Sequence, residues 1–132
     1  MNEEEFKRRT KALGLQVIRL VEGLPRGRTG EVIARQLLRS ATSVGANYRA
    51  ACRAKSNADM IHKLTIVEEE GDETMYWLEL LGEAGLLPPT QLAPLTQEAN
   101  EIVAMTVASI RTLRKKQRPS RSNPKSPLQN RK

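Results

Sequence analysis

The 132-residue sequence is poor in cysteine, histidine and aromatic residues. Cys52 is the only cysteine, which excludes an intramolecular disulfide and is typical of a chain in a reducing compartment. Four aromatic side chains are too few for a protein that reads single-stranded nucleic acid by stacking bases on aromatic rings. The residues that are abundant instead, Leu, Ala, Glu and Arg, favour helices over strands.

Long apolar runs are absent as well. No stretch of about 18 apolar residues is present, so the sequence predicts no transmembrane helix. The first residues, MNEEEFKRR, are charged and no signal-peptide core follows them. We therefore expect a cytoplasmic protein that makes no use of a membrane.

Acidic residues are missing from the end of the chain, and the net charge of +7 is concentrated there. Residues 1–110 hold 13 Lys and Arg against 15 Asp and Glu, a net −2, whereas residues 111–132 hold nine basic residues and no acid. The last segment, RPSRSNPKSPLQNRK, has three prolines and one sizeable apolar residue, Leu128. It cannot bury enough surface to offset its ordering entropy, so we predict a disordered basic tail over residues 118–132.

The remaining residues, 1–117, form a single predicted domain of four helices. Helical periodicity covers about residues 3–22, 29–55, 57–84 and 90–116, and the breaks GLPRGRTG, SNAD and GLLPPT separate them. Thr29, Ser56 or Asn57, and Thr90 are the predicted N-caps of the last three helices. Four long helices with short connections predict an all-α, antiparallel up-down-up-down four-helix bundle.

The second helix divides into three faces at about 100° per residue. The predicted core face consists of Ile33, Leu37, Ala41, Val44, Tyr48 and Ala51. The opposite face carries an arginine stripe, and a small polar flank separates the two. The stripe contains Arg35, Arg39, Arg49 and Arg53, and the flank contains Gln36, Ser40, Ser43, Asn47 and Ala54. Small side chains in the flank let a neighbouring backbone approach closely.

The third helix has two apolar faces, although a monomeric bundle needs only one. Its predicted core face is Met60, Leu64, Val67, Gly71, Thr74, Met75 and Leu78. An outer acidic face holds Glu69, Asp72, Glu79 and Glu83. A further set comprises Ile66, Glu70, Glu73, Trp77 and Leu80 or Leu81. We predict that this further set packs against another chain, and that Glu70 and Glu73 pair with some of the arginines, within or between chains. Solvated, unpaired arginines are the competing interpretation.

Catalytic chemistry has little support. GLPRGRTG lacks the spacing and the lysine of a phosphate-binding loop, and no strand precedes it. His62 has no second histidine at metal-binding spacing, so it is expected to be structural or solvent-facing, and Cys52 to pack as a small hydrophobe. We predict no enzyme activity, no metal and no cofactor.

Nucleic-acid binding by charge is better supported. The predicted contact residues are Arg26, Arg28, Arg49, Arg53, Lys55, Arg111, Arg114, Lys115, Lys116, Arg118 and Arg121. Scarce aromatics favour recognition of the shape and charge of structured RNA or a duplex, with RNA the favoured partner. A basic tail that only keeps the chain soluble is the alternative.

Two motifs carry a resemblance to a known family. The run RSATSVGAN at Arg39–Asn47 and the run EGDETMYWL at Glu70–Leu78 resemble the four-helix bundle protein family, also called the 23S rRNA intervening-sequence protein family. The resemblance covers roughly residues 5–115 and leaves out the basic tail. That family is related to the accessory variability determinant of diversity-generating retroelements, which partners a reverse transcriptase and binds nucleic acid.

The resemblance implies a four-helix protomer assembled into a ring-shaped homopentamer. It also implies that the signature positions serve packing and assembly rather than catalysis; these are Arg39, Ser40, Ser43, Asn47, Glu70, Glu73 and Trp77. The second apolar face of the third helix adds Ile66 and Leu80 to the predicted assembly residues. The prediction is therefore a homo-oligomeric nucleic-acid-binding protein, and in a narrower form a reverse transcriptase accessory subunit. The alternative is an oligomeric protein-interaction scaffold.

Overall fold

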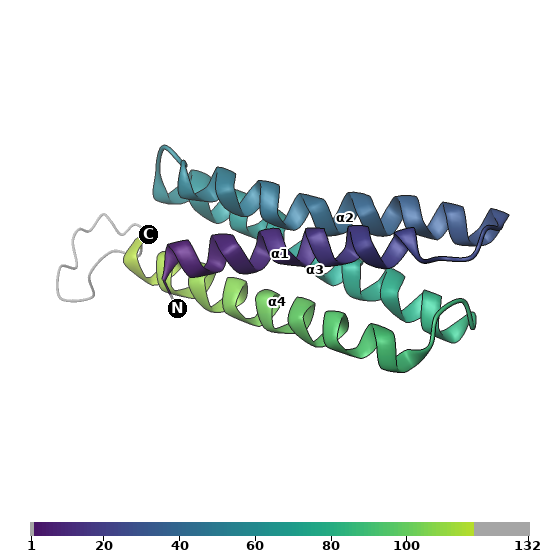
Figure 1. The fold of residues 1–132 in the computed structure, drawn as a ribbon. Helices are drawn as coiled ribbons and strands as arrows, with labels where there is room; N and C mark the ends of the chain where they lie inside the picture. The colour runs from purple at the N-terminus through teal and green to yellow at the C-terminus, as the bar shows by residue number, and fades with distance from the viewer. Residues whose placement is uncertain (1, 118–132) are drawn as a thin grey trace, which may run out of the picture.

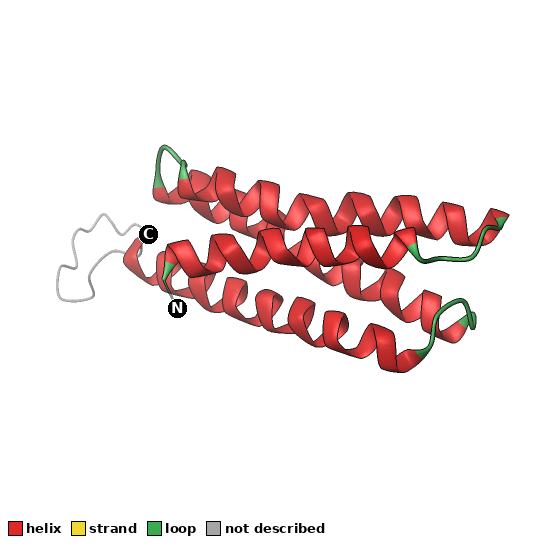
Figure 2. Ribbon diagram, viewed as in Figure 1, coloured by secondary structure: helices red, strands yellow, loops and turns green. Residues whose placement is uncertain are grey.

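A computed structural model describes residues 2–117, which form four long helices joined by short loops (Figures 1 and 2). Helix α1 spans Glu3–Glu22, α2 Arg28–Cys52, α3 Asn57–Glu83 and α4 Pro89–Gln117. Over the described residues every regular element is a helix, which confirms the predicted all-α class. No helix among residues 2–117 is long and apolar enough to cross a membrane. The predicted tail, residues 118–132, lies outside the described part of the chain.

The helices run alternately up and down, so that consecutive helices are antiparallel neighbours (Figure 1). Helix α2 packs between α1 and α3, and α3 packs between α2 and α4, whereas α1 and α4 approach each other only sparsely. Arg9 bridges this weaker seam: its guanidinium binds both oxygens of Glu98, at 2.8 and 2.6 Å, and Oε1 of Glu101 at 2.8 Å. One side chain from α1 therefore ties the bundle closed along α4.

Helix starts differ from the prediction in two of three places. Ser56 caps α3 as expected, its hydroxyl accepting a hydrogen bond from the Asp59 amide at 3.1 Å. Thr29 does not cap α2, because the helix already includes Arg28 and its N-cap is Gly27, which has no capping side chain. Thr90 is also wrong as a cap, because α4 begins at Pro89, whose fixed φ suits a first helical position. The second helix ends at Cys52 rather than Lys55, so Lys55 belongs to the α2–α3 turn.

The core follows the predicted faces closely. All six predicted core residues of α2 are buried, and α3 contributes Leu64, Val67, Gly71, Thr74 and Leu78 as expected. Leu81, placed with the second apolar face as an alternative to Leu80, is fully buried in the core instead. Cys52 is half-buried against the core, which confirms its packing role.

Close helix approach depends on small residues at two seams. A Cβ on Gly45 would lie 3.2 Å from the Thr10 carbonyl oxygen of α1, and one on Gly71 would lie 2.7 Å from Cγ2 of Val103 on α4. Ser40 is completely buried, deeper than the flank position predicted for it, and accepts a hydrogen bond at 3.1 Å from the Thr74 hydroxyl of α3. Among the predicted flank residues, Ser40 therefore lies at the close approach to α3, whereas the close approach to α1 depends on Gly45, which is outside the flank.

Candidate nucleic-acid interface

A cationic concavity of about 640 Å³ lies where α2 ends and α3 begins. Four basic side chains line it: Arg49 and Arg53 from α2, Lys55 from the turn, and Lys63 from α3. The remaining lining residues are Ala46, Ala50, Ser56 and Asp59. Small floor residues leave room for a ligand, and Asp59 is the only acid in the lining. We refer to this surface as the α2–α3 concavity.

Local geometry explains why these cations converge. Arg49 and Arg53 are four residues apart and therefore share one face of α2. The turn after Cys52 then reverses the chain, and the Asp59 carboxylate accepts a hydrogen bond from the Lys55 backbone amide at 3.2 Å. This contact holds the turn against the first turn of α3. No ion pair involves Arg49, Arg53, Lys55 or Lys63 within the described residues, so their charges are available to a ligand.

Lys63 was missed by the sequence analysis. It is the only lysine or arginine between Asn57 and Gly85, and it lies less than two turns beyond the start of α3. In an antiparallel hairpin such a position comes back alongside the last turns of the preceding helix. The sequence pattern did not give the rotation of α3 about its own axis that turns Lys63 toward α2, because this rotation depends on how the helices pack.

A second basic cluster lies at the same end of the bundle. Helix α4 ends at the same end of the bundle as the α2–α3 turn (Figure 1). Its last two turns carry four exposed cations, Arg111, Arg114, Lys115 and Lys116. Arg118 and Arg121, the remaining predicted contacts, lie outside the described residues. The chain thus gathers two groups of predicted contact residues at one end of the bundle.

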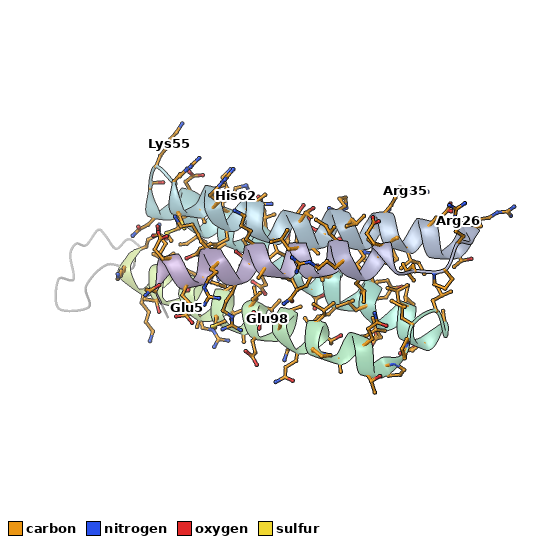
Figure 3. All side chains as sticks on the ribbon, in the orientation of Figure 1. Glu5, Arg26, Arg35, Lys55, His62 and Glu98 are labelled. Carbon is orange, nitrogen blue, oxygen red and sulfur yellow. The ribbon has the colours of Figure 1, made fainter. Side chains whose placement is uncertain are left out.

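Arg26 and Arg28 are not brought to that end. Arg26 belongs to the α1–α2 connection and Arg28 opens α2, and the labelled side chains of Arg26 and Lys55 stand at opposite ends of the molecule (Figure 3). The sequence prediction treated both groups as one footprint. Because a helix of 25 residues separates them, a ligand must be long to meet both.

Arg39 differs from the other arginines of the stripe. Its guanidinium donates to Glu70 Oε2 at 3.1 Å and to Glu73 Oε2 at 2.5 Å, so the pairing predicted for Arg39 occurs within one chain. The hydrogen bonds that Arg39 donates, to Glu70 first and to Glu73 second, raise the pKa of its guanidinium. The Trp77 indole N–H also donates to Glu73 Oε2, at 2.9 Å. This bond first, and Arg39 second, lower the pKa of the Glu73 carboxyl below its ordinary value.

Other signature positions also form hydrogen bonds inside the protomer. Asn47 donates its side-chain amide to the Ser43 carbonyl oxygen at 2.9 Å within α2, and Ser40 accepts a hydrogen bond from Thr74 across the seam between α2 and α3. The signature residues therefore have structural roles within the protomer. Their role in assembly stays a prediction.

The second apolar face of α3 is largely covered by the chain itself. Ile66, Trp77 and Leu80 are half-buried, and the last two pack against the core. The aromatic side chain that protrudes is Tyr76, which is 51% exposed and meets the Trp77 ring edge-on at 5.1 Å between centroids. The most exposed apolar side chain of α3 is therefore Tyr76, one residue before Trp77, which the sequence pattern predicted.

No set of three His, Cys, Asp or Glu side chains among residues 2–117 could hold a metal ion. His62 is exposed, and burial raises the pKa of the Cys52 thiol, which keeps it protonated at neutral pH.

Comparisons with known proteins agree on the fold. The family model described as 23S rRNA-intervening sequence protein matches residues 3–108. A crystal structure from Bacteroides thetaiotaomicron, of a protein with unknown function from the S23 ribosomal protein family, is 33% identical to this chain with a TM-score of 0.78. The match covers 84% of this chain and 99% of that one. None of the curated proteins compared matches.

Proposed function

Since the chain belongs to the 23S rRNA-intervening sequence protein family, we propose that it is a non-enzymatic, homo-oligomeric protein that binds structured RNA or an RNA/DNA duplex. The observation that supports this most directly is the α2–α3 concavity. Four cations without ion pairs in the described residues surround a floor of small residues there. The cations of the α4 end lie at the same end of the bundle and extend the surface.

Recognition in this proposal rests on charge and shape. The chain has four aromatic residues, of which Phe6 and Tyr48 are buried and Trp77 is half-buried. Tyr76 alone is exposed, and one ring is too little for a platform on which successive unpaired bases stack. Arg and Lys side chains instead bind phosphates, releasing counterions as they do so. Affinity should therefore depend steeply on salt and weakly on sequence.

A homopentameric ring is the assembly we propose, on the strength of the resemblance to the family. Repetition of one protomer would present several copies of the α2–α3 concavity to a single long nucleic acid. Multivalent contact of this kind raises avidity without any new type of contact. A reverse transcriptase is the proposed protein partner in the narrower form of the hypothesis, in which this chain is its accessory subunit in a diversity-generating retroelement.

A protein-interaction scaffold is the second candidate, and the exposed apolar side chains favour it. Leu15, Ile18, Val32 and Tyr76 are each at least 40% exposed. If this candidate is correct, a pull-down should recover a protein partner that survives nuclease and high salt.

Filter binding across a salt series tests the first candidate. Full-length protein should retain a structured RNA and an RNA/DNA duplex at low salt, with the logarithm of affinity falling linearly with the logarithm of salt concentration. A chain lacking residues 117–132, with Arg49 and Arg53 neutralised as well, should lose most of this affinity. Unchanged binding by that variant would reject the proposed interface.

A further inference from the structure

A groove of about 560 Å³ runs between α1 and α2 on the outside of the bundle. Its floor is made of small residues, Gly14, Gly45 and Ala46, because α1 and α2 approach closely there. Two large apolar side chains, Leu15 at 44% exposure and Ile18 at 40%, stand open within it. Exposed apolar side chains in a concave surface indicate a binding site rather than ordinary surface.

Basic residues flank this α1–α2 groove. Arg8, Lys11 and Arg49 line it, are exposed, and form no ion pair within the described residues. Lys7 differs, since it pairs with Glu3 and Glu4 of its own helix. An apolar floor with unpaired cations at its rim fits an amphipathic helix that carries acidic residues around an apolar side chain.

Helix α3 presents such a surface. Residues spaced by three, four, three and four positions fall on one face of a helix, and on α3 they form an acidic stripe consisting of Glu69, Asp72, Tyr76, Glu79 and Glu83. All five are exposed, and none of the four carboxylates forms an ion pair within residues 2–117. Tyr76 supplies the apolar centre, at 51% exposure.

The acidic stripe cannot reach the groove of its own chain. Asp72, Tyr76, Glu79 and Glu83 line the surface between α3 and α4. Over their described residues, the backbones of α1 and α3 do not approach each other, and each helix packs against α2 instead. The two complementary surfaces of one protomer therefore face different directions.

We propose that the α1–α2 groove of one copy receives the acidic stripe of a second copy. Tyr76 would cover Leu15 and Ile18, while the flanking carboxylates meet Arg8, Lys11 and Arg49. The lengths agree, since the groove residues of α1 run from Glu4 to Ile18 and the stripe from Glu69 to Glu83, about 21 Å each. Since the two surfaces differ, the contact is heterologous: of two joined copies, one keeps a free stripe and the other a free groove, so that further copies can add.

This inference rests on the homo-oligomeric part of the proposed function. Arg49 lines both the α1–α2 groove and the α2–α3 concavity, so the variants that test the contact leave Arg49 unchanged. It also moves the assembly surface from the half-buried Trp77 to the exposed Tyr76. A second copy is favoured over a foreign helix because both halves of the contact, opposite in charge and equal in length, are present in one chain.

Two variants test the contact. A groove variant, Arg8→Glu with Lys11→Glu, keeps an intact stripe, and a stripe variant, Tyr76→Glu, keeps an intact groove. The altered groove and the altered stripe are both acidic, so they repel each other. Light scattering should give an oligomer for the unmodified chain and a monomer for each variant alone. Equimolar mixing should give a particle of twice the chain mass, because one intact groove meets one intact stripe and growth stops there.

Circular dichroism establishes that each variant stays helical, and Arg35→Glu, exposed and outside both surfaces, should remain oligomeric as the control. Variants that keep the mass of the unmodified chain would reject this contact while leaving the homo-oligomer intact. A monomeric unmodified chain would overturn both the contact and the proposed self-assembly. Failure of the mixture to form the double-mass particle would reject the pairing of these two surfaces. Filter binding of RNA by the unmodified chain is a separate measurement, and its outcome bears only on the nucleic-acid proposal.

Discussion

Arg39 on α2 and Glu73 on α3 form an ion pair within one chain, with 2.5 Å between Nη2 and Oε2. The same guanidinium reaches Glu70, whose side chain is only 18% exposed and whose Oε1 is buried without a hydrogen-bond partner. Arg39 is itself half-exposed, so solvent screens part of the attraction. Arg39 nevertheless balances the negative charge of the Glu70 carboxylate, which is too buried to be fully hydrated.

Arg39→Leu is expected to destabilise the fold by about 1 kcal/mol, because it leaves the Glu70 carboxylate without its cation. This corresponds to a thermal midpoint lower by roughly 4 °C at pH 7, measured by circular dichroism. Arg35→Leu is the matched control, since Arg35 is exposed and unpaired in the described residues. Equal effects of the two substitutions would contradict the structural role of Arg39.

Acid should weaken the same seam. The pKa of Glu73 in the folded chain lies below the ordinary 4.5, because Trp77 and Arg39 stabilise the carboxylate. A folded-state pKa below the unfolded one contributes stability above pH 4.5, and this contribution is lost as pH falls through the folded value. Urea midpoints at pH 7 and pH 3 should therefore differ less for Glu73→Gln than for the unmodified chain. Some pH dependence should remain in Glu73→Gln, because the pKa of Glu101 is also lowered, by Arg9 first and by Gln97 second.

Gly71→Ala should destabilise the bundle by about 1–3 kcal/mol through overpacking. The added Cβ would meet Cγ2 of Val103 at 2.7 Å, and a β-branched side chain cannot rotate away freely. Gly82→Ala is the control in the same helix, because its Cβ meets the flexible end of Leu92 at 3.1 Å. The double variant Gly71→Ala with Val103→Ala should recover most of the stability that Gly71→Ala alone loses, as measured by denaturant unfolding. If the effects of the two substitutions simply add, the proximity of these two residues is contradicted.

Arg9→Met should loosen α1 from α4. It removes the two hydrogen bonds to Glu98 and the one to Glu101 along the sparsest seam of the bundle. We expect a destabilisation of about 1–2 kcal/mol and faster amide hydrogen exchange in α1 than in α2. Arg8→Met, at the exposed neighbouring position, controls for charge. Uniform acceleration over all four helices would show that the effect is global rather than local.

The two ends of the bundle should differ in nucleic-acid binding if the proposed interface is correct. Arg53→Ala with Lys63→Ala removes two cations from the α2–α3 concavity, and Arg26→Ala with Arg28→Ala removes two from the opposite end. The first pair should reduce the salt slope of RNA binding by up to about 2, because each phosphate that a protein neutralises on a duplex adds roughly 0.9 to that slope. The second pair should change the salt slope little. A larger effect of the Arg26 and Arg28 substitutions would place the interface at the opposite end of the bundle.

Helix existence and core faces could be predicted from the sequence because both are local properties. A period of 3.6 residues identified all six core residues of α2, and glycine and proline placed the breaks within a few residues. Two caps were wrong because residues such as Pro89 and Arg28 can open a helix without a capping side chain. Charge pairing of Arg39 with Glu70 and Glu73 was predicted because all three share a seam between consecutive helices.

The candidate site needed the tertiary structure. Sequence alone determined that the chain is a basic-ended four-helix bundle, since periodicity, composition and charge order are written along the chain. Which cations meet was decided by the rotation and antiparallel pairing of helices, which bring Lys63 to Arg49 and Arg53 and hold Arg26 away from them. The same rotation covers much of Trp77 and exposes Tyr76, because neighbouring positions on a helix point about 100° apart.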